Sequence, residues 1–222
     1  MRRLSTLVAA LATVFAVGSA NALVVLIDDF NSPDLEVIDQ AGGGATVSLP
    51  TNPNGRYVSH ELLSGTNTLG GIGSSVTIGS SSIPTGSLNV NNSTGRDSEV
   101  KVGWTLANGL ILDNTFGPAS FLFDVITSDA NATSAALYFN NVLIGSYSIP
   151  GNTSNLPLSF AVSAATQNLM ALGGNLELVL NGANEWDLSL DSFGVTIPEP
   201  TSIALVGLAL LGAGVASRRR QA

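Results

Sequence analysis

Carboxylates near both ends of the central segment are the residues best suited to chemistry in this sequence. Asp28 and Asp29 close an apolar run typical of a strand, so one of them must point toward apolar neighbours. Such a carboxylate is costly unless it is hydrogen-bonded or bound to a cation, and hard oxygen donors suit Ca²⁺. Alternation slips by one between Leu190 and Phe193, which predicts a bulge near Asp191. Asp28, Asp29 and Asp191 are therefore candidate ligands of a structural calcium ion; the alternative is a pair of aspartates in a solvated turn.

Aromatic side chains form a second candidate site, because carbohydrate-binding sites commonly present exposed rings. Tyr138 and Tyr147 flank a predicted hairpin turn at Asn140-Asn141 and are expected to share one face of its strands. Leu143 belongs to the same face, so burial under a loop is an equally good interpretation. The two tryptophans lie on the apolar faces of their strands and are predicted core residues: Trp104 and Trp186.

Catalysis has weak support. The chain has no cysteine, and its one histidine, His60, would face away from its neighbour Glu61 in a strand. A glycosidase needs only two carboxylates, but no pattern marks a pair. The serines lie outside any Gly-x-Ser-x-Gly elbow. We therefore expect a protein that is not an enzyme.

The elements that must position these residues are short strands. Apolar or alternating runs with Gly, Pro, Asn and Ser between them fill residues 23–197, which predicts an all-β, antiparallel, jelly-roll-like sandwich. The Ser- and Gly-rich segment 64–95 could be a flexible insertion, but its apolar alternation favours strands with long loops. One short helix is expected at 164–172. The expected strands are 23–30, 36–39, 45–49, 56–63, 75–78, 87–90, 98–106, 119–128, 135–139, 142–149, 176–180 and 186–190.

Charge divides the chain into three blocks. The 222 residues carry a net charge of −8, but five of the eight basic residues lie near the termini. Residues 23–197 hold fifteen acidic and three basic residues, a net charge of −12. Phosphate neutralisation needs clustered Lys and Arg, so nucleic acid is excluded as a partner.

The N-terminal block is typical of a secretory signal. Arg2 and Arg3 precede an apolar run over 4–17, and Ala20 and Ala22 form an A-x-A cleavage site. We expect a signal helix at 1–22, the Sec export machinery and signal peptidase as partners, and a mature chain that begins at Leu23. An uncleaved membrane anchor is the alternative.

The C-terminal block combines three features. Pro198-Glu199-Pro200 forms an extended, exposed spacer, because proline excludes both helix and ladder pairing. A transmembrane helix of about 202–217 follows; it would be about 25 Å long, which is marginal for a bilayer. Arg218, Arg219 and Arg220 should stay in the cytoplasm, which leaves residues 23–197 outside the inner membrane.

This order of spacer, apolar helix and Arg cluster resembles the PEP-CTERM sorting signal of bacterial exosortase substrates, over Ile197 to Ala222. The resemblance implies export in a Gram-negative bacterium, transient anchoring in the inner membrane and recognition by exosortase. It further implies cleavage near Pro198-Glu199-Pro200 and transfer to the cell surface or its exopolysaccharide. A plain single-pass anchor with a rigid linker is the alternative.

A second resemblance concerns 23–197. Asp28-Asp29-Phe30 and Leu190-Asp191-Ser192-Phe193 look like the opening and closing strands of galactose-binding-like or carbohydrate-binding jelly rolls. It implies that the first and last strands are neighbours and that calcium is held near them. We favour a non-enzymatic surface or matrix protein associated with exopolysaccharide. A secreted carbohydrate-binding module is the alternative, and a glycoside-active enzyme is less favoured.

Overall fold

The computed structural model describes residues 23–39, 45–48, 55–64, 74–79, 85–111 and 117–197. The predicted signal peptide, with Ala20 and Ala22, and the sorting segment 198–222 lie outside these ranges. Within them, no helix has both the length and the apolar character needed to cross a membrane. The elements are β1 (Leu23–Asp28), β2 (Leu35–Ile38), β3 (Ala45–Ser48), β4 (Tyr57–Ser64), β5 (Ser74–Gly79), β6 (Ser87–Asn92), β7 (Asp97–Leu106), β8 (Ser120–Ser128), β9 (Thr133–Phe139), β10 (Val142–Ile149), β11 (Ser154–Ala161), α2 (Ala164–Met170), β12 (Gly174–Gly182) and β13 (Leu188–Ile197).

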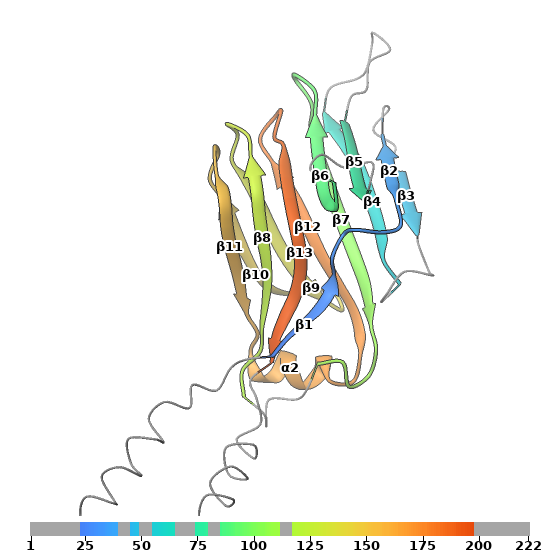
Figure 1. Cartoon of the computed structure of the whole chain (residues 1–222), viewed down its shortest axis with the longest axis vertical. Helices are drawn as coiled ribbons and strands as arrows, with labels where there is room; N and C mark the ends of the chain where they lie inside the picture. The colour runs from blue at the N-terminus through green and yellow to red at the C-terminus, as the bar shows by residue number, and fades with distance from the viewer. Residues whose placement is uncertain are drawn as a thin grey trace, which may run out of the picture.

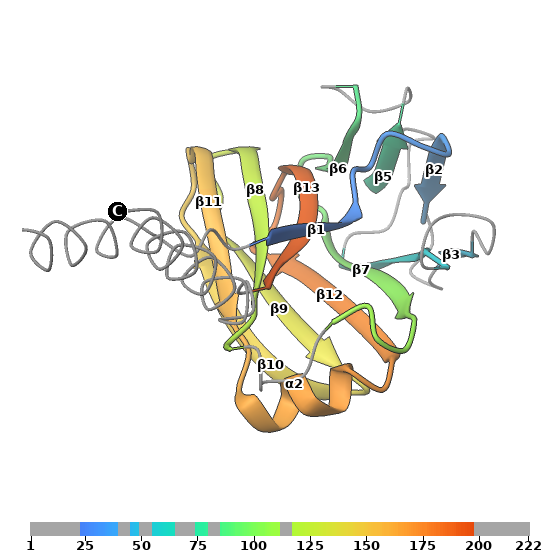
Figure 2. The ribbon, with the colours of Figure 1, turned by 60° about the horizontal axis from the view of Figure 1, so that its bottom comes forward.

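The strands form two antiparallel sheets that face each other across one core (Figures 1 and 2). Sheet A has seven strands in the order β11-β8-β13-β6-β5-β2, with β1 paired to β13. Sheet B has six strands in the order β10-β9-β12-β7-β4-β3. The predicted all-β antiparallel sandwich is therefore confirmed.

Two segments test the strand prediction closely. The region 64–95 contains β5 and β6, which pair over Ser74–Gly79 and Ser87–Asn92, so the expectation of strands with long loops is correct. In contrast, β11 was not expected, because Pro157 interrupts its pattern. Proline is tolerated there because β11 is an edge strand of sheet A, where one side needs no ladder partner.

Alternation builds the core. In β7, Val100, Val102, Trp104 and Leu106 are buried, as the period-two pattern predicts, and Trp186 is buried too. Phe193 of β13 is the aromatic centre, with its ring centroid 4.6 Å from that of Trp104. The rings of Phe121 and Phe123 lie 5.4 and 5.2 Å from it. Strands from both sheets therefore meet on one side chain.

The last strand organises sheet A. One side of β13 pairs with β8 along its length, from Leu188 to Thr196. Its other side is shared: residues Leu188–Leu190 pair with β6, and Phe193–Ile197 pair with β1. The register shifts between Leu190 and Phe193, so the predicted bulge is confirmed, as is the predicted contact of the first and last strands.

The hairpin and the helix were predicted from local signals. Asn140 and Asn141 adopt φ of 46° and 67°, the left-handed conformation that a two-residue turn needs. The side chain of Ser163 caps α2 by accepting a hydrogen bond from the Thr166 N–H at 3.2 Å. The helix ends at Met170, two residues earlier than expected.

Candidate functional site

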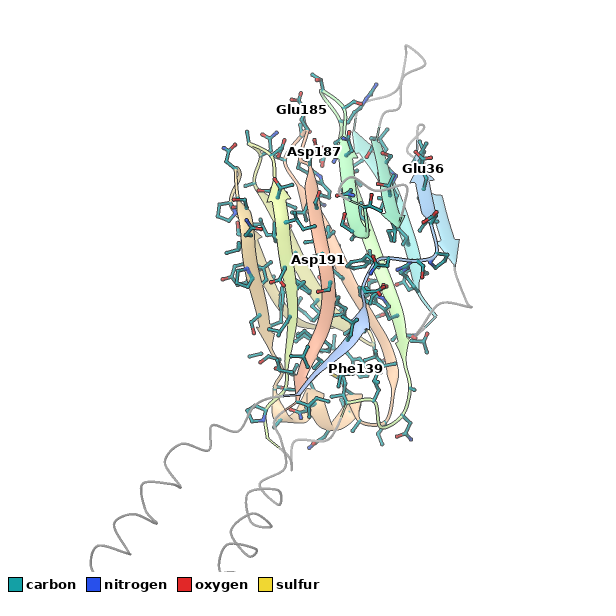
Figure 3. All side chains as sticks on the ribbon, in the orientation of Figure 1. Glu36, Phe139, Glu185, Asp187 and Asp191 are labelled. Carbon is teal, nitrogen blue, oxygen red and sulfur yellow. The ribbon has the colours of Figure 1, made fainter. Side chains whose placement is uncertain are left out.

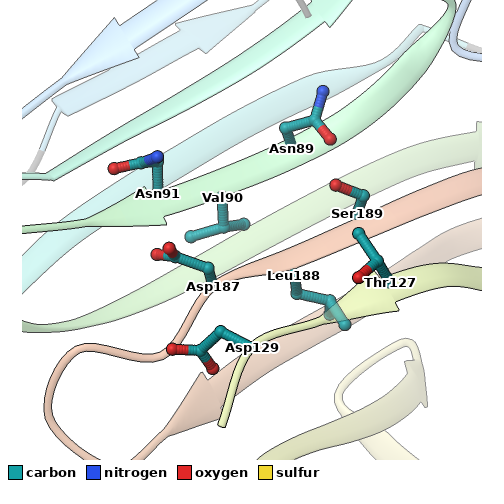
Figure 4. Close-up of a pocket in the computed structure, with 8 residues that line it drawn as sticks. All are labelled: Asn89, Val90, Asn91, Thr127, Asp129, Asp187, Leu188 and Ser189. Atoms are coloured by element: carbon teal, nitrogen blue, oxygen red, sulfur yellow. The ribbon is translucent and has the colours of Figure 1, made fainter. Parts of the chain in front are cut away.

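The outer face of sheet A carries a pocket where β6, β8 and the start of β13 lie side by side (Figure 4). Its volume is about 260 Å³. Strand alternation positions the lining, because Leu88, Val90, Leu188 and Leu190 fill the core and send the residues between them outward. The pocket is lined by Asn89, Val90, Asn91, Thr127, Asp129, Asp187, Leu188 and Ser189.

A second pocket of about 300 Å³ lies on the same face, between β8, β11 and β13. Figure 3 shows Asp187 at the upper end of β13 and Asp191 farther along it. Because β8 and β13 contribute to both pockets, the two form one polar strip across sheet A, here called the sheet A strip. The second pocket is lined by Asp124, Val125, Ile126, Asn155, Pro157 and Asp191.

Two carboxylates meet in the first pocket. The backbone N–H of Asp129 donates to the carbonyl of Asp187 at 3.2 Å, which holds the two turns together. Burial raises the pKa of Asp187, the Asn92 N–H lowers it, and the negative charge of Asp129 raises it. The Asn92 N–H donates to Asp187 Oδ1 at 2.7 Å, and the Asn131 N–H donates to Asp129 Oδ1 at 2.9 Å.

The chemistry of the sheet A strip is that of multiple hydrogen bonds. Amides, hydroxyls and carboxylates offer both donors and acceptors, which is the set that sugar hydroxyls need. None of the residues that line the two pockets is aromatic, so the strip offers no stacking platform. The pair Asp129 and Asp187 also supplies the two carboxylates that glycoside hydrolysis requires.

The three carboxylates predicted to hold calcium are not brought together. Asp28 points into the core, where it accepts from Arg56 Nη1 at 2.8 Å and from Trp104 Nε1 at 2.8 Å. Asp29 is exposed, and its pKa is lowered by hydrogen bonds from the Asn31 side chain and from the Asn31 N–H, which lies 3.1 Å away. Asp191 lines the outer pocket. Among the described residues, no group of three or more His, Asp or Glu side chains could hold a metal ion.

Arg56 therefore neutralises the buried carboxylate of Asp28, the role that the sequence suggested for calcium. Its side chain is fully buried, and its guanidinium also donates to the carbonyl of Ser32 at 3.0 Å. Burial of one of the two aspartates was predicted, and Asp28 is the buried one, but its counter-charge comes from Arg56, the residue directly before β4, rather than from a metal ion. Pairing so far along the chain leaves no local signal in the sequence.

Tyr138 and Tyr147 do not share a face, so the predicted arrangement is wrong. A bulge in β10 between Leu143 and Gly145 shifts the register, so Tyr147 pairs with the buried Ala135. The Tyr147 ring lies against Phe160, with centroids 6.1 Å apart. Tyr138 stays on the outer face of sheet B, opposite Leu143. Sugar binding by either ring stays a prediction.

His60 belongs to a buried chain of hydrogen bonds. Its Nδ1 accepts the Asp39 N–H at 3.2 Å, so Nε2 carries the proton and donates to Ser74 Oγ at 2.7 Å. The Ser74 hydroxyl donates to Asn92 Oδ1 at 2.5 Å. A hydrolase needs the histidine to accept the serine proton, and here the direction is reversed. Burial lowers the pKa of His60, which suits a neutral ring that ties sheet B to sheet A.

The end of β13 leads into the C-terminal block, and Ile197, the last described residue, still pairs with Leu23. Residues 196–220 match the model of the PEP-CTERM protein-sorting motif. The chain carries a PEP-CTERM sorting motif. The match confirms the resemblance predicted from Pro198-Glu199-Pro200 and Arg218–Arg220, and a PEP-CTERM motif implies an exported exosortase substrate.

No curated protein matches the PEP-CTERM chain significantly. Among solved structures, a family 11 carbohydrate-binding module of the cellulase Lic26A-Cel5E of Clostridium thermocellum is similar, with 15% identity, 81% of this chain and 97% of that chain covered, and a TM-score of 0.38. The xylan-binding module CBM15 is similar at 8% identity, with coverage of 71% and 99% and a TM-score of 0.36. At such low identity and TM-score, nothing about ligands is inferred for this chain from those modules.

Apart from Asp191, which was predicted as a calcium ligand, the residues of the sheet A strip were missed by sequence reasoning. Asn89 and Asn91 alternate with buried residues of β6, and Ser189 alternates with buried residues of β13. Polar residues that alternate with a core on two neighbouring strands are a usable signal. It was hidden because the neighbours β6 and β13 are far apart in the sequence.

Proposed function

We propose that this PEP-CTERM protein is a non-enzymatic surface or matrix protein that associates with exopolysaccharide through the sheet A strip. The observation that carries the proposal is the sorting motif at 196–220 at the end of a complete sandwich. The strip supports the choice of polysaccharide, because its amides, hydroxyls and carboxylates match sugar hydroxyls.

Processing near Pro198-Glu199-Pro200 is compatible with the fold. The ladder between β1 and β13 ends at Leu23 and Ile197. A cut before Leu23 and a second cut after Ile197 remove no strand, so the released domain keeps its core. The expected product is a mature chain that begins at Leu23, after signal peptidase has cut behind Ala22, and ends near Glu199.

The net charge of the domain limits the class of polysaccharide that it can bind. A net charge of −12 over 23–197 repels acidic polymers unless divalent cations bridge them. Neutral polysaccharide is therefore the expected class of ligand.

Binding is tested with the processed protein in affinity electrophoresis through gels that contain the host's exopolysaccharide. Asn91→Ala with Asp191→Asn removes groups from both pockets, and retardation is expected to fall by about tenfold, equivalent to about 1.4 kcal/mol. Asn181→Ala with Glu61→Gln makes matched changes in sheet B and should leave retardation unchanged. Equal loss in both variants, or in neither, contradicts the assignment of the strip.

Sorting is tested separately by fractionation of the host with and without its exosortase. Mass spectrometry of the surface form should find a C-terminus near Glu199. Retention of Arg218–Arg220 in that form would defeat the processing proposal.

A glycoside-active enzyme is the second candidate, favoured by the pair Asp129 and Asp187 in one pocket. Release of reducing sugar from the bound polysaccharide, abolished by Asp187→Asn, would establish it. The non-enzymatic proposal expects no release by the unmodified protein.

A further inference from the structure

Large apolar side chains are exposed mainly at one end of the sandwich. Of the eight that stand out among the described residues, six belong to α2, to the turn that follows it, to the start of β10 or to β1. We call this region the α2 end. Its exposed apolar residues are Val24, Leu26, Val142, Leu143, Leu169 and Leu172.

Hydrogen bonds hold these elements together at that end. The Gln167 side chain of α2 accepts from the Ala119 N–H at 2.9 Å, directly before β8. Ser120, the first residue of β8, pairs with Thr196, one residue before the end of β13. The β9–β10 hairpin joins them, because the Asn140 N–H donates to the Asn175 carbonyl at 2.8 Å.

α2 and the β9–β10 hairpin carry no charged side chain. The sequence has no charged residue between Asp129 and Glu177, a stretch that includes α2 and the β9–β10 hairpin. Figure 3 shows Glu185 and Asp187 at the end of the molecule opposite Phe139, which lies near α2. α2 and the β9–β10 hairpin are therefore uncharged elements of an acidic domain, and an anionic lipid surface does not repel them directly.

Chain length fixes where this end must lie before processing. Five residues, 198–202, separate Ile197 from the uncharged apolar run that begins at Ile203. Fully extended, this connection spans at most about 20 Å. The interfacial layer on each side of the hydrocarbon core takes up about 5–8 Å of that reach.

We propose that the α2 end docks on the lipid interface while the chain is anchored, with Leu169 and Leu172 in contact with the headgroup region. This inference rests on the proposed membrane anchoring of the sorting signal. Leu169 lies in the last turn of α2, and Leu172 follows in the adjoining turn, where its N–H donates to the Leu169 carbonyl at 3.1 Å. The two side chains are 58% and 70% exposed. Docking holds Pro198-Glu199-Pro200 at the membrane surface, where a membrane-embedded exosortase can reach it.

The absence of cysteine makes a clean test possible, because any introduced cysteine is unique. Leu169→Cys and Leu172→Cys are made in the full chain, spin-labelled and reconstituted in phosphatidylethanolamine–phosphatidylglycerol vesicles. Leu63→Cys is the matched control, since Leu63 is an exposed leucine near the end of β4, where Ser64 pairs with Asp97 of β7. Flotation first establishes that each variant is anchored. Aqueous nickel should then relax the labels at 169 and 172 about threefold less than the label at 63.

Each outcome has a separate meaning. Equal nickel accessibility at all three positions in floated vesicles overturns the docking inference and leaves the anchoring proposal intact. Failure to float overturns the anchoring proposal itself. Protection with spin–spin broadening indicates a second copy of the chain as the occupant, and protection that needs co-reconstituted exosortase indicates the enzyme. Either of these overturns the lipid assignment.

Discussion

Replacement of Asp28 by asparagine is expected to cost much of the stability of the sandwich. Both oxygens of the Asp28 carboxylate accept hydrogen bonds from Arg56 Nη1, at 2.8 and 2.9 Å, and one of them also accepts from Trp104 Nε1 at 2.8 Å. It also accepts the Phe30 N–H at 2.9 Å. An amide in its place turns one acceptor into a donor that faces other donors, and it leaves the buried guanidinium without a counter-charge.

The magnitude follows from the burial of the pair. The side chains of Arg56 and Asp28 are 0% and 4% exposed, so water cannot replace the lost partner. Removal of one member of such a pair costs about 3–5 kcal/mol. A domain of this size loses about 2–4 °C in Tm for each kcal/mol, so Tm should fall by about 6–20 °C.

Thermal and urea unfolding, followed by tryptophan fluorescence, measure this loss. Asp29→Asn is the matched control, since it makes the same change at the next residue, which is exposed, and should shift stability by at most about 0.5 kcal/mol. Asp28→Asn combined with Arg56→Met removes the orphaned charge and should recover part of the loss. If Asp28→Asn and Asp29→Asn cost the same, the ion pair does not stabilise the fold as argued.

Three further predictions concern packing, pH and calcium. Gly103→Ala should cost about 1–3 kcal/mol, because a Cβ there would overlap the Tyr57 ring; an unchanged urea midpoint would contradict it. Stability should fall as the pH drops from 6.5, the ordinary pKa of histidine, toward the lowered pKa of His60 in the fold, because in that range only the unfolded chain takes up the proton. His60→Gln should flatten this part of the profile of stability against pH, and parallel profiles for the two proteins would contradict the prediction. Millimolar Ca²⁺ should leave Tm as it is in EDTA, because Asp28 is paired with Arg56; a rise would restore the predicted calcium site.

Local signals predicted much of the fold. The left-handed pair Asn140-Asn141, the bulge at Asp191 and the burial of Trp104 each follow from a few neighbouring residues. The face of Tyr147 could not be predicted, because a bulge in an edge strand leaves only a weak trace in the pattern. A single such slip moves every following side chain to the other side.

The candidate site was harder to predict than the fold. The predicted sorting residues form one continuous segment of the sequence, so they could be predicted without knowledge of the fold. The pocket that Asp129 and Asp187 share joins two turns separated by β9–β12, and the Asp28–Arg56 pair joins residues on different elements. Such pairs depend on strand order, and strand order is a property of the whole chain that alternation does not encode.

The central place of β13 has a consequence for how the chain is made. β13 is the last strand of the domain, yet it is the strand to which β1 pairs and the one that joins the β5–β6 pair to the β8–β11 pair, and its Phe193 completes the aromatic core. Synthesis proceeds from the N-terminus, so neither sheet A nor the core can close until about residue 197 has emerged. Contacts that span nearly the entire domain also make folding slow. The sandwich therefore stays open during translation, a condition in which a chain can thread through a narrow channel, and it can close only once β13 is available.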